Sequence, residues 1–391
     1  VDYDFRPSST FYYLTGFEEP NAAAVIRNTV YGGNGVEFIM FVEEREGTLV
    51  NWLGPVYGPD GAVEYFGADS AYTFDRLGTT VTSYINSGVY GNIYSNLNEN
   101  NTVAVIINDS GTDTGQFLSV TGLVDQLRVI KSSVEIALIR NATNVSVQAF
   151  TEAINRIEPG MYEYEVDAIM NLILRLNGCP RNAFPTIVAS GPNITTLHYP
   201  AGTRQMLDGD LVMIDYGAEY GYYTSDLTRT LPVNGSFSTE QRAVYEIVLE
   251  THKAIIDLIA PGVSYYYLYN LNIEMMIDGL LEKGIITGNR SEIISSRRYY
   301  QYIPAGLAHP VGLDVHDPFP AEANRDKILK ENMVMAFEPH IYLYQGDQSV
   351  NSAYWTISAR IEDTILITAN GYEILSSSLP IEIADIEALM R

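Results

Sequence analysis

The fold of this chain is decided by the stretch LVMIDYGAEYGYYTSDLTRT, residues 211–230. It opens with an almost continuous apolar run that ends in Asp215, which predicts a buried strand. A turn rich in glycine and tyrosine follows, and Asp226 begins the next strand-like segment. The two aspartates are eleven positions apart, so a hairpin between them would bring their side chains face to face.

Further acids and histidines lie in or beside other strand-like runs. They are His309 and His316 in AHPVGLDVHD (308–317), Glu338 in MVMAFEPHIY (333–342) and Glu362 in ARIEDTILIT (359–368). Buried carboxylates are costly to bring together unless cations compensate them. Carboxylate oxygens with one imidazole suit a hydrolytic site that holds two divalent metal ions, such as Mn²⁺, Co²⁺ or Zn²⁺.

Each of these residues alone also has an ordinary structural explanation. An aspartate at a strand end is commonly a turn or capping residue, and a histidine between apolar residues is commonly a hydrogen-bonded core residue. The structural explanation weakens because four acids and two histidines share the same kind of position. The spacing by itself leaves both a metal site and a structural role open.

The region around these segments carries a weak internal repeat. IEPGMYEYEV (157–166) aligns with IAPGVSYYYL (259–268) through Ile, Pro-Gly, Tyr and a final aliphatic residue. Apolar residues at helical spacing predict helices over 132–156 and 163–177, and another from Ser238 onward. Because helical patterns flank each copy and strand-like runs follow, we expect an α+β domain made of two helix–helix–sheet units.

The first part of the chain is organised differently. Short strands and helices alternate over 22–108, and the apolar runs 37–42 and 103–107 predict buried strands of an α/β sheet. A chain of 391 residues is too long for one ordinary core. We expect an α/β domain over 1–125 and the larger domain over 126–391.

The composition restricts the possible partners. The chain has 48 acidic and 23 basic residues, a net charge of −25, which argues against binding to nucleic acid or to an anionic membrane surface. No apolar run reaches the roughly 18 residues that span a bilayer. Cys179 is the single cysteine, which excludes an internal disulfide. Low charge and several Asn-x-Ser/Thr triplets suggest a secreted or cell-surface location, but an Asn-rich chain also contains such triplets by chance; they start at Asn100, Asn108, Asn141, Asn144, Asn193, Asn234 and Asn289.

These segments resemble the metallopeptidase family with the pita-bread fold, which includes aminopeptidase P, prolidase, methionine aminopeptidase and creatinase. The words DYG, SDLTRT, AHPVGLDVHD, FEP and RIEDT match the surroundings of its ligands. The ligand order of the family is Asp, Asp, His, Glu, Glu, which is met by Asp215, Asp226, His309, Glu338 and Glu362. Two further site histidines of the family match His198, in TLHY, and His316.

The resemblance covers nearly the whole chain. TFYYLTGFEEP (10–20), NWLGPVYG (51–58), IKSSVEIALIR (130–140) and VASG (188–191) all resemble aminopeptidase P. It implies a pita-bread domain preceded by a smaller creatinase-like α/β domain, which we expect to lack its first strand and helix because few residues precede the first match. Prolidase is the alternative activity, and a catalytically silent binding or surface protein on the same fold is a second alternative, which the full ligand set disfavours.

The resemblance implies hydrolysis of the bond between an N-terminal residue and a following proline, with two divalent metal ions. Manganese is the expected metal, and cobalt or zinc are the alternatives. Asp226 and Glu362 would bridge the ions, with Asp215 on one ion and His309 on the other. Glu338 would bind metal and carry a proton to the leaving nitrogen.

The remaining site residues would act around the metal ligands. His198 and His316 would stabilise the oxyanion and the proline carboxamide. Arg360 and Tyr342 match positions beside the ligands, where Arg360 would orient the acids. Family members form oligomers, so we expect a homodimer or homotetramer; Trp52 is expected to pack in a core, or else to form a pocket wall for a neighbouring subunit. The usual location in the family is cytoplasmic.

Overall fold

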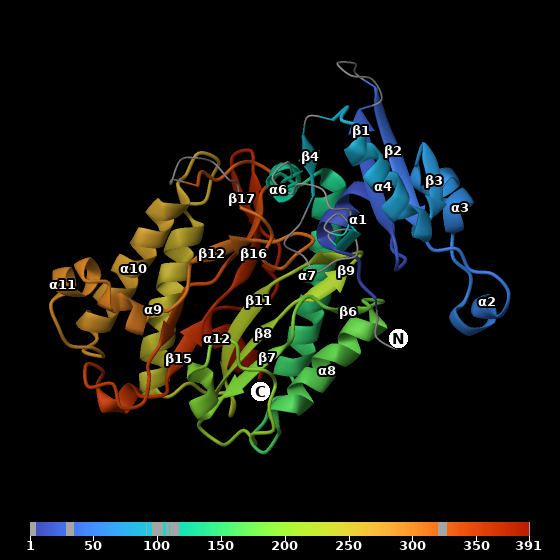
Figure 1. The fold of residues 1–391 in the computed structure, drawn as a ribbon. Coiled ribbons are helices and arrows are strands. Elements are labelled where there is room, and N and C mark those ends of the chain that lie inside the picture. Colours follow the sequence, from blue (N-terminus) through green and yellow to red (C-terminus); the bar gives the residue numbers. More distant parts are fainter. Residues whose placement is uncertain are drawn as a thin grey trace. The chain divides into compact units, whose positions relative to one another are not determined.

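The computed structural model describes residues 5–28, 35–90, 92–95, 105–106, 109, 117–319 and 327–390. The chain divides into two compact units, Val1–Asp125 and Gln126–Arg391, which Figure 1 shows from blue to red along the sequence. Within the described residues, no helix combines the length and apolar character that crossing a membrane requires.

The first unit contains a three-stranded sheet in the order β1-β2-β3. Strand β2 pairs antiparallel with β1 and parallel with β3. The described helices and strands of this unit are α1 (Ser9–Thr15), β1 (Ala23–Asn28), β2 (Val36–Val42), α2 (Thr48–Leu53), α3 (Gly58–Phe66), β3 (Ser70–Thr73), α4 (Leu77–Asn86), β4 (Ile93–Tyr94) and β5 (Phe117–Leu118). The boundary between the units falls within α6 (Thr121–Val129).

Two sequence predictions for this unit had opposite outcomes. The run 37–42 forms most of β2, whose last residues are buried. Of the run 103–107, the structure describes only Val105 and Ile106; their backbone is helical and Val105 is 52% exposed, so the predicted buried strand is wrong there.

The expected core position of Trp52 is also wrong. Its side chain is 84% exposed, and α2 has no buried residue. A six-residue helix between Gly47 and Gly54 is too short to present a packed face. The apolar side chains of α2 therefore face outward.

The second unit consists of two helix pairs with antiparallel strands between them (Figure 1). Two of its sheets have the orders β11-β8-β7 and β12-β13-β16-β17, and two smaller ones have the orders β10-β9-β6 and β14-β15. Its helices are α7 (Ser133–Ile154), α8 (Glu163–Leu176), α9 (Thr239–Ile256), α10 (Tyr265–Glu282), α11 (Arg290–Ser295) and α12 (Ile383–Leu389). Its strands are β6 (Arg181–Asn182), β7 (Ile187–Ser190), β8 (Leu211–Tyr216), β9 (Ala218–Tyr220), β10 (Tyr223–Thr224), β11 (Leu227–Pro232), β12 (Ala308–Pro310), β13 (Val334–Phe337), β14 (His340–Tyr342), β15 (Ser358–Arg360), β16 (Asp363–Thr368) and β17 (Gly371–Ile374).

The long helices begin where the sequence predicts. Ser132 caps α7 and forms a capping box with Glu135, and Ser238 does the same for α9 with Gln241. In a capping box the two side chains satisfy backbone N–H groups that have no partner within the helix. These pairs are local, which is why the helix starts can be predicted from the sequence.

The internal repeat has the same backbone hydrogen bonds in both copies. Gly160 N–H donates to the Met206 carbonyl at 2.8 Å, and Gly262 N–H donates to the Leu329 carbonyl at 2.9 Å. Both glycines have positive φ, at 102° and 92°, a conformation that favours glycine. Each copy therefore makes the same turn between two helices, as expected for a duplicated unit.

Candidate metal centre

The first pair of acids comes from the β8–β11 hairpin. All six residues of β8 are buried, and Asp215 lies opposite Thr228 in the register. Asp226 immediately precedes β11. The connection between β8 and β11 contains the short strands β9 and β10. Asp226 lies two residues before Thr228, the residue that pairs with Asp215. Because side chains alternate along a strand, Asp226 and Thr228 share a face.

The second group of residues comes from the other sheet. His309 lies on β12, Glu338 follows β13, and Glu362 precedes β16. These three strands are neighbours in the sheet, and Glu338 N–H donates to the Leu307 carbonyl at 2.8 Å. Thr228 and Glu362 form an isolated antiparallel bridge. The two sheets therefore meet at the acids, and each half of the duplication supplies some of them.

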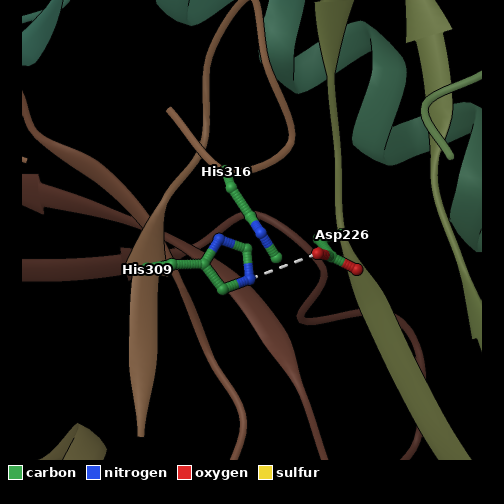
Figure 2. A group of neighbouring side chains, drawn as sticks. All are labelled: Asp226, His309 and His316. Atoms are coloured by element: carbon green, nitrogen blue, oxygen red, sulfur yellow. Dashed lines mark ion pairs between the residues drawn. The ribbon is translucent and has the colours of Figure 1, made fainter. Parts of the chain in front are cut away.

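The structure brings all five predicted ligand residues together. Candidate ligand atoms of Asp215, Asp226 and Glu362 lie within 4.8 Å of one another, as do those of His309, Glu338 and Glu362. His309 Nε2 is 3.3 Å from Asp226 Oδ2 and 3.8 Å from Glu362 Oε1. Figure 2 shows His309 turned toward Asp226, with His316 beside it.

The acids of the centre are electrostatically strained without cations. Burial raises the pKa of Asp215 to about 6 and that of Glu338 to about 8, and raises the pKa of Asp226 well above its usual value. Burial acts in the same direction on Glu362, but His309 and Arg360 keep the pKa of that carboxyl below its ordinary value. Positive charge is therefore needed to keep all four acids ionised near neutral pH.

The residues fit a divalent metal centre. Asp215 Oδ1 and Asp226 Oδ1 are buried and have no hydrogen-bond partner. Buried polar atoms of this kind need a partner, and a metal ion supplies one. Carboxylate oxygens with one imidazole nitrogen are the donor set of hydrolytic divalent metals. The unpaired oxygen on each aspartate is thus available as a ligand for a cation.

Arg360 lies within the group of acids. Its guanidinium donates to Asp215, its Nε donates to Thr228 Oγ1 at 3.0 Å, and its Nη1 is 3.7 Å from Glu338 Oε2. Tyr342 is fully buried, but its hydroxyl donates to Met213 Sδ, at 3.5 Å, rather than to an acid. Arg360 is therefore placed to orient the carboxylates, whereas Tyr342 packs beside them.

The two predicted outer histidines differ in their surroundings. The His316 ring lies 4.3 Å from the ring of His309, centre to centre, in an edge-on arrangement (Figure 2). Burial and the neighbouring His309 lower the pKa of His316, and His198 contributes in the same direction. His198 is exposed and close enough to influence His316. His316 is thus a neighbour of the candidate ligand His309, and His198 lies on the exposed side of His316.

The sequence interpretation missed two residues at this site. Thr228 Oγ1 donates to Glu362 Oε2 at 2.7 Å while it accepts from Arg360, and its position two residues after Asp226 was the available signal. His340 is buried; its Nδ1 is 2.7 Å from the Glu338 carbonyl, and Ala305 N–H donates to its Nε2 at 3.2 Å. Its place directly after Glu338-Pro339 was a weaker signal.

Comparisons with known proteins agree with this architecture. The model of metallopeptidase family M24 matches residues 137–369, and the model of the aminopeptidase P N-terminal domain matches residues 1–94. The Xaa-Pro aminopeptidases of Haemophilus influenzae and Escherichia coli are 35% and 34% identical to the whole chain, over 89% and 90% of their own lengths.

Solved structures show the same likeness. A zinc-substituted E. coli aminopeptidase P in complex with product aligns with a TM-score of 0.92 and 34% identity, over 100% of this chain and 90% of that chain. Proline aminopeptidase P II from Yersinia pestis aligns with a TM-score of 0.92 and 33% identity, over 100% of this chain and 92% of its own. The predicted family and pita-bread fold are confirmed. The chain belongs to metallopeptidase family M24 and carries the N-terminal domain of the aminopeptidase P type.

Proposed function

We propose that this enzyme is an Xaa-Pro aminopeptidase, which releases the N-terminal residue from peptides with proline in second position. The observation that carries the proposal is the convergence of Asp215, Asp226, His309, Glu338 and Glu362 at the junction of two sheets. The relatives named Xaa-Pro aminopeptidase align along the whole chain, N-terminal unit included.

Two divalent metal ions, manganese first, would be held by these five residues. Asp226 and Glu362, which are shared between the groups of neighbouring ligand atoms, would hold the ions together with Asp215 and His309. When bound, the ions supply Lewis acidity, which polarises the scissile carbonyl and lowers the pKa of the attacking water. Arg360 holds Asp215 and Thr228 holds Glu362, so both carboxylates keep fixed orientations.

Glu338 is the residue best suited to move a proton. Its side chain is 16% exposed, more than those of Asp215, Asp226 and Glu362, so it is the acid of the centre most open to water and substrate. It would accept a proton from the attacking water and deliver it to the leaving proline nitrogen. His198 and His316 would donate hydrogen bonds to the oxyanion and to the proline carboxamide. We propose Arg360 and Tyr342 as supporting residues.

A homodimer or homotetramer is the expected assembly. Helix α2 exposes Leu49 by 52%, Trp52 by 84% and Leu53 by 58%, an apolar group that a second copy of the chain would cover. Light scattering on the purified protein measures the assembly directly, and a monomer would contradict this proposal.

Peptides of three or more residues should be cleaved better than X-Pro dipeptides. A dipeptidase must bind the free carboxylate of the terminal proline, which requires an available cation. Arg360 of the centre contacts Asp215, and Arg229, on the adjoining strand β11, is 2.7 Å from Asp363, so these two cations are already paired. We expect a higher kcat/KM for Ala-Pro-Ala than for Ala-Pro.

The same assay tests the proposed activity. Ala-Ala-Ala is the matched control, because it differs from Ala-Pro-Ala only at the second residue. Efficient release of alanine from Ala-Ala-Ala would contradict the proline requirement. A preference for Ala-Pro over Ala-Pro-Ala would favour prolidase instead, and no hydrolysis by the metal-loaded protein would favour a silent binding protein.

His316→Ala should retain the metal ions but lose activity. Its ring lies beside His309 and is available to the substrate, so we expect a loss of about 2–4 kcal/mol of transition-state stabilisation, the size of one oxyanion donor. The measurement is kcat/KM for Ala-Pro-Ala together with metal content by mass spectrometry. His309→Ala is the comparison and should lose metal as well as activity. Loss of metal in His316→Ala would make that residue a ligand.

A further inference from the structure

Glu163, the first residue of α8, is a fully buried acid outside the metal centre. Its Oε1 accepts hydrogen bonds from Ser190 N–H at 2.8 Å, from Ser190 Oγ at 2.7 Å and from Asn193 Nδ2 at 3.1 Å. All three donors belong to the end of β7 and the short 3₁₀ helix, Gly191–Thr195, that follows it. A buried carboxylate with several donors from one segment fixes that segment to its helix.

The segment held by Glu163 leads directly to His198. Asn193 Nδ2 also donates to the Tyr199 hydroxyl at 2.9 Å, so one amide joins residues on both sides of His198. The chain then returns to the same helix end, where Tyr164 N–H donates to the Gly202 carbonyl at 3.1 Å. A Cβ at Gly202 would lie 2.3 Å from the Tyr199 hydroxyl and 2.7 Å from Glu163 Oε2. The loop is therefore closed tightly around the buried acid.

A second group of polar contacts supports the same loop. Arg204 Nη1 donates to Ser190 Oγ at 2.8 Å and to Asp210 Oδ2 at 2.7 Å. The imidazole of His198, by contrast, is exposed, and no hydrogen bond from the described residues reaches it. The place from which the His198 side chain extends is consequently set by the backbone of the loop, and this backbone is anchored on Glu163.

In the second copy of the repeat, the first residue of the second helix makes comparable contacts. Tyr265 begins α10 as Glu163 begins α8: their N–H groups donate to the carbonyls of Lys327 and Arg204, at 3.0 and 3.1 Å. The Tyr265 hydroxyl lies close to Gly306, three residues before His309: a Cβ at Gly306 would be 3.3 Å from it. In both halves, the first residue of the second helix contacts the segment that carries a site histidine.

We propose that Glu163 is a positioning residue for His198: its carboxylate holds the loop 190–202 in the conformation that presents the imidazole to the substrate. The proposal rests on the proposed function, in which His198 acts on the bound peptide. Glu163 would contribute nothing to catalysis except through His198. The two residues should therefore behave as one unit when both are changed.

A double-mutant cycle tests this directly, with kcat/KM for Ala-Pro-Ala as the readout. We expect His198→Ala to lose about 10²-fold, the effect of one oxyanion donor. Glu163→Ala should lose roughly ten- to a hundredfold, because a misplaced group acts poorly. In the His198→Ala background, Glu163→Ala should cost less than about twofold more. Glu163→Gln keeps an acceptor for the same donors and should stay within about threefold of the wild type.

Additive losses in the cycle, or full activity in folded Glu163→Ala, would overturn the proposal. If Glu163→Ala does not fold, Asn193→Ala is the alternative variant, because the partly exposed Asn193 side chain donates to both Glu163 and Tyr199. It should show the same non-additivity with His198→Ala. NMR of histidine rings gives a second readout that needs no activity. The signal assigned to His198 should shift in Glu163→Ala and be restored in Glu163→Gln. If the wild type does not cleave Ala-Pro-Ala, the proposed function fails, but the NMR signal still tests whether Glu163 positions His198. An unchanged His198 signal in Glu163→Ala would contradict the positioning role of Glu163.

Discussion

Removal of metal by a chelator is expected to abolish release of alanine from Ala-Pro-Ala, and Mn²⁺ or Co²⁺ should restore it. The physical reason is that three buried acids, the partly buried Glu338 and one histidine form the centre, and bound cations would supply the positive charge that these acids need. The measurements are metal content by mass spectrometry and kcat/KM in the same samples, with two ions per chain in the active form. Full activity in a sample stripped of metal would end the proposal of a metal-dependent hydrolase.

The affinity for these ions should rise with pH. In the metal-free protein burial raises the pKa of Asp215 to about 6 and that of Glu338 to about 8, so below these values a metal ion must displace protons. Tighter Mn²⁺ binding is therefore expected as the pH rises from 6 to 8 (the interval between these two pKa values), with proton release that calorimetry in different buffers can measure. Equal affinity across this interval, without proton release, would contradict the assignment of these acids as ligands.

Arg229→Met is expected to give a large loss of stability. Arg229 is fully buried; its Nη2 donates to Asp363 Oδ1 at 2.7 Å, and its Nη1 donates to the Glu362 carbonyl at 2.6 Å. The substitution leaves Asp363 as a buried charge without its main partner, which costs about 3–5 kcal/mol. For a domain of this size the loss corresponds to roughly 10 °C in the melting temperature of the metal-loaded protein, measured by calorimetry.

The stability lost in Arg229→Met should depend on pH, because the substitution changes the pKa of Asp363. Burial alone would raise the pKa of Asp363, but Arg229 and His252 hold that pKa well below its usual value. A group with a lowered folded-state pKa stabilises the protein above its unfolded pKa of about 3.9, and this contribution is lost as the pH falls. Without Arg229, burial raises the pKa and Asp363 is protonated more readily. The difference from the wild type should therefore be smaller at low pH than at pH 8.

Arg140→Met is the matched control for Arg229→Met. Arg140 also pairs with an acid, Glu373, but the two side chains are 38% and 45% exposed. An exposed pair of this kind contributes about 1 kcal/mol or less. An equal change in melting temperature for the two variants would show that the burial of the Arg229–Asp363 pair does not determine the loss. A melting temperature of Arg229→Met that equals the wild-type value at pH 8 would show that Asp363 finds another partner.

The sequence by itself determined the features that depend on local order. Helix starts at Ser132 and Ser238 follow from capping pairs three residues apart, and the strand β8 follows from its apolar run. The five candidate ligands could be named because their order and neighbouring residues match one family. The repeat could be found because both copies need a glycine for the same positive-φ turn.

The tertiary structure alone decided how these residues are supported. Thr228 and Glu362 are 134 positions apart in the sequence, and so are Arg229 and Asp363, yet both pairs are hydrogen-bonded and buried. Glu163 differs from the surface acids of this chain because its side chain is buried. Trp52 differs from the apolar residues of the core because its side chain is exposed. Such differences arise from contacts between distant segments, which a residue's own type and neighbours do not specify.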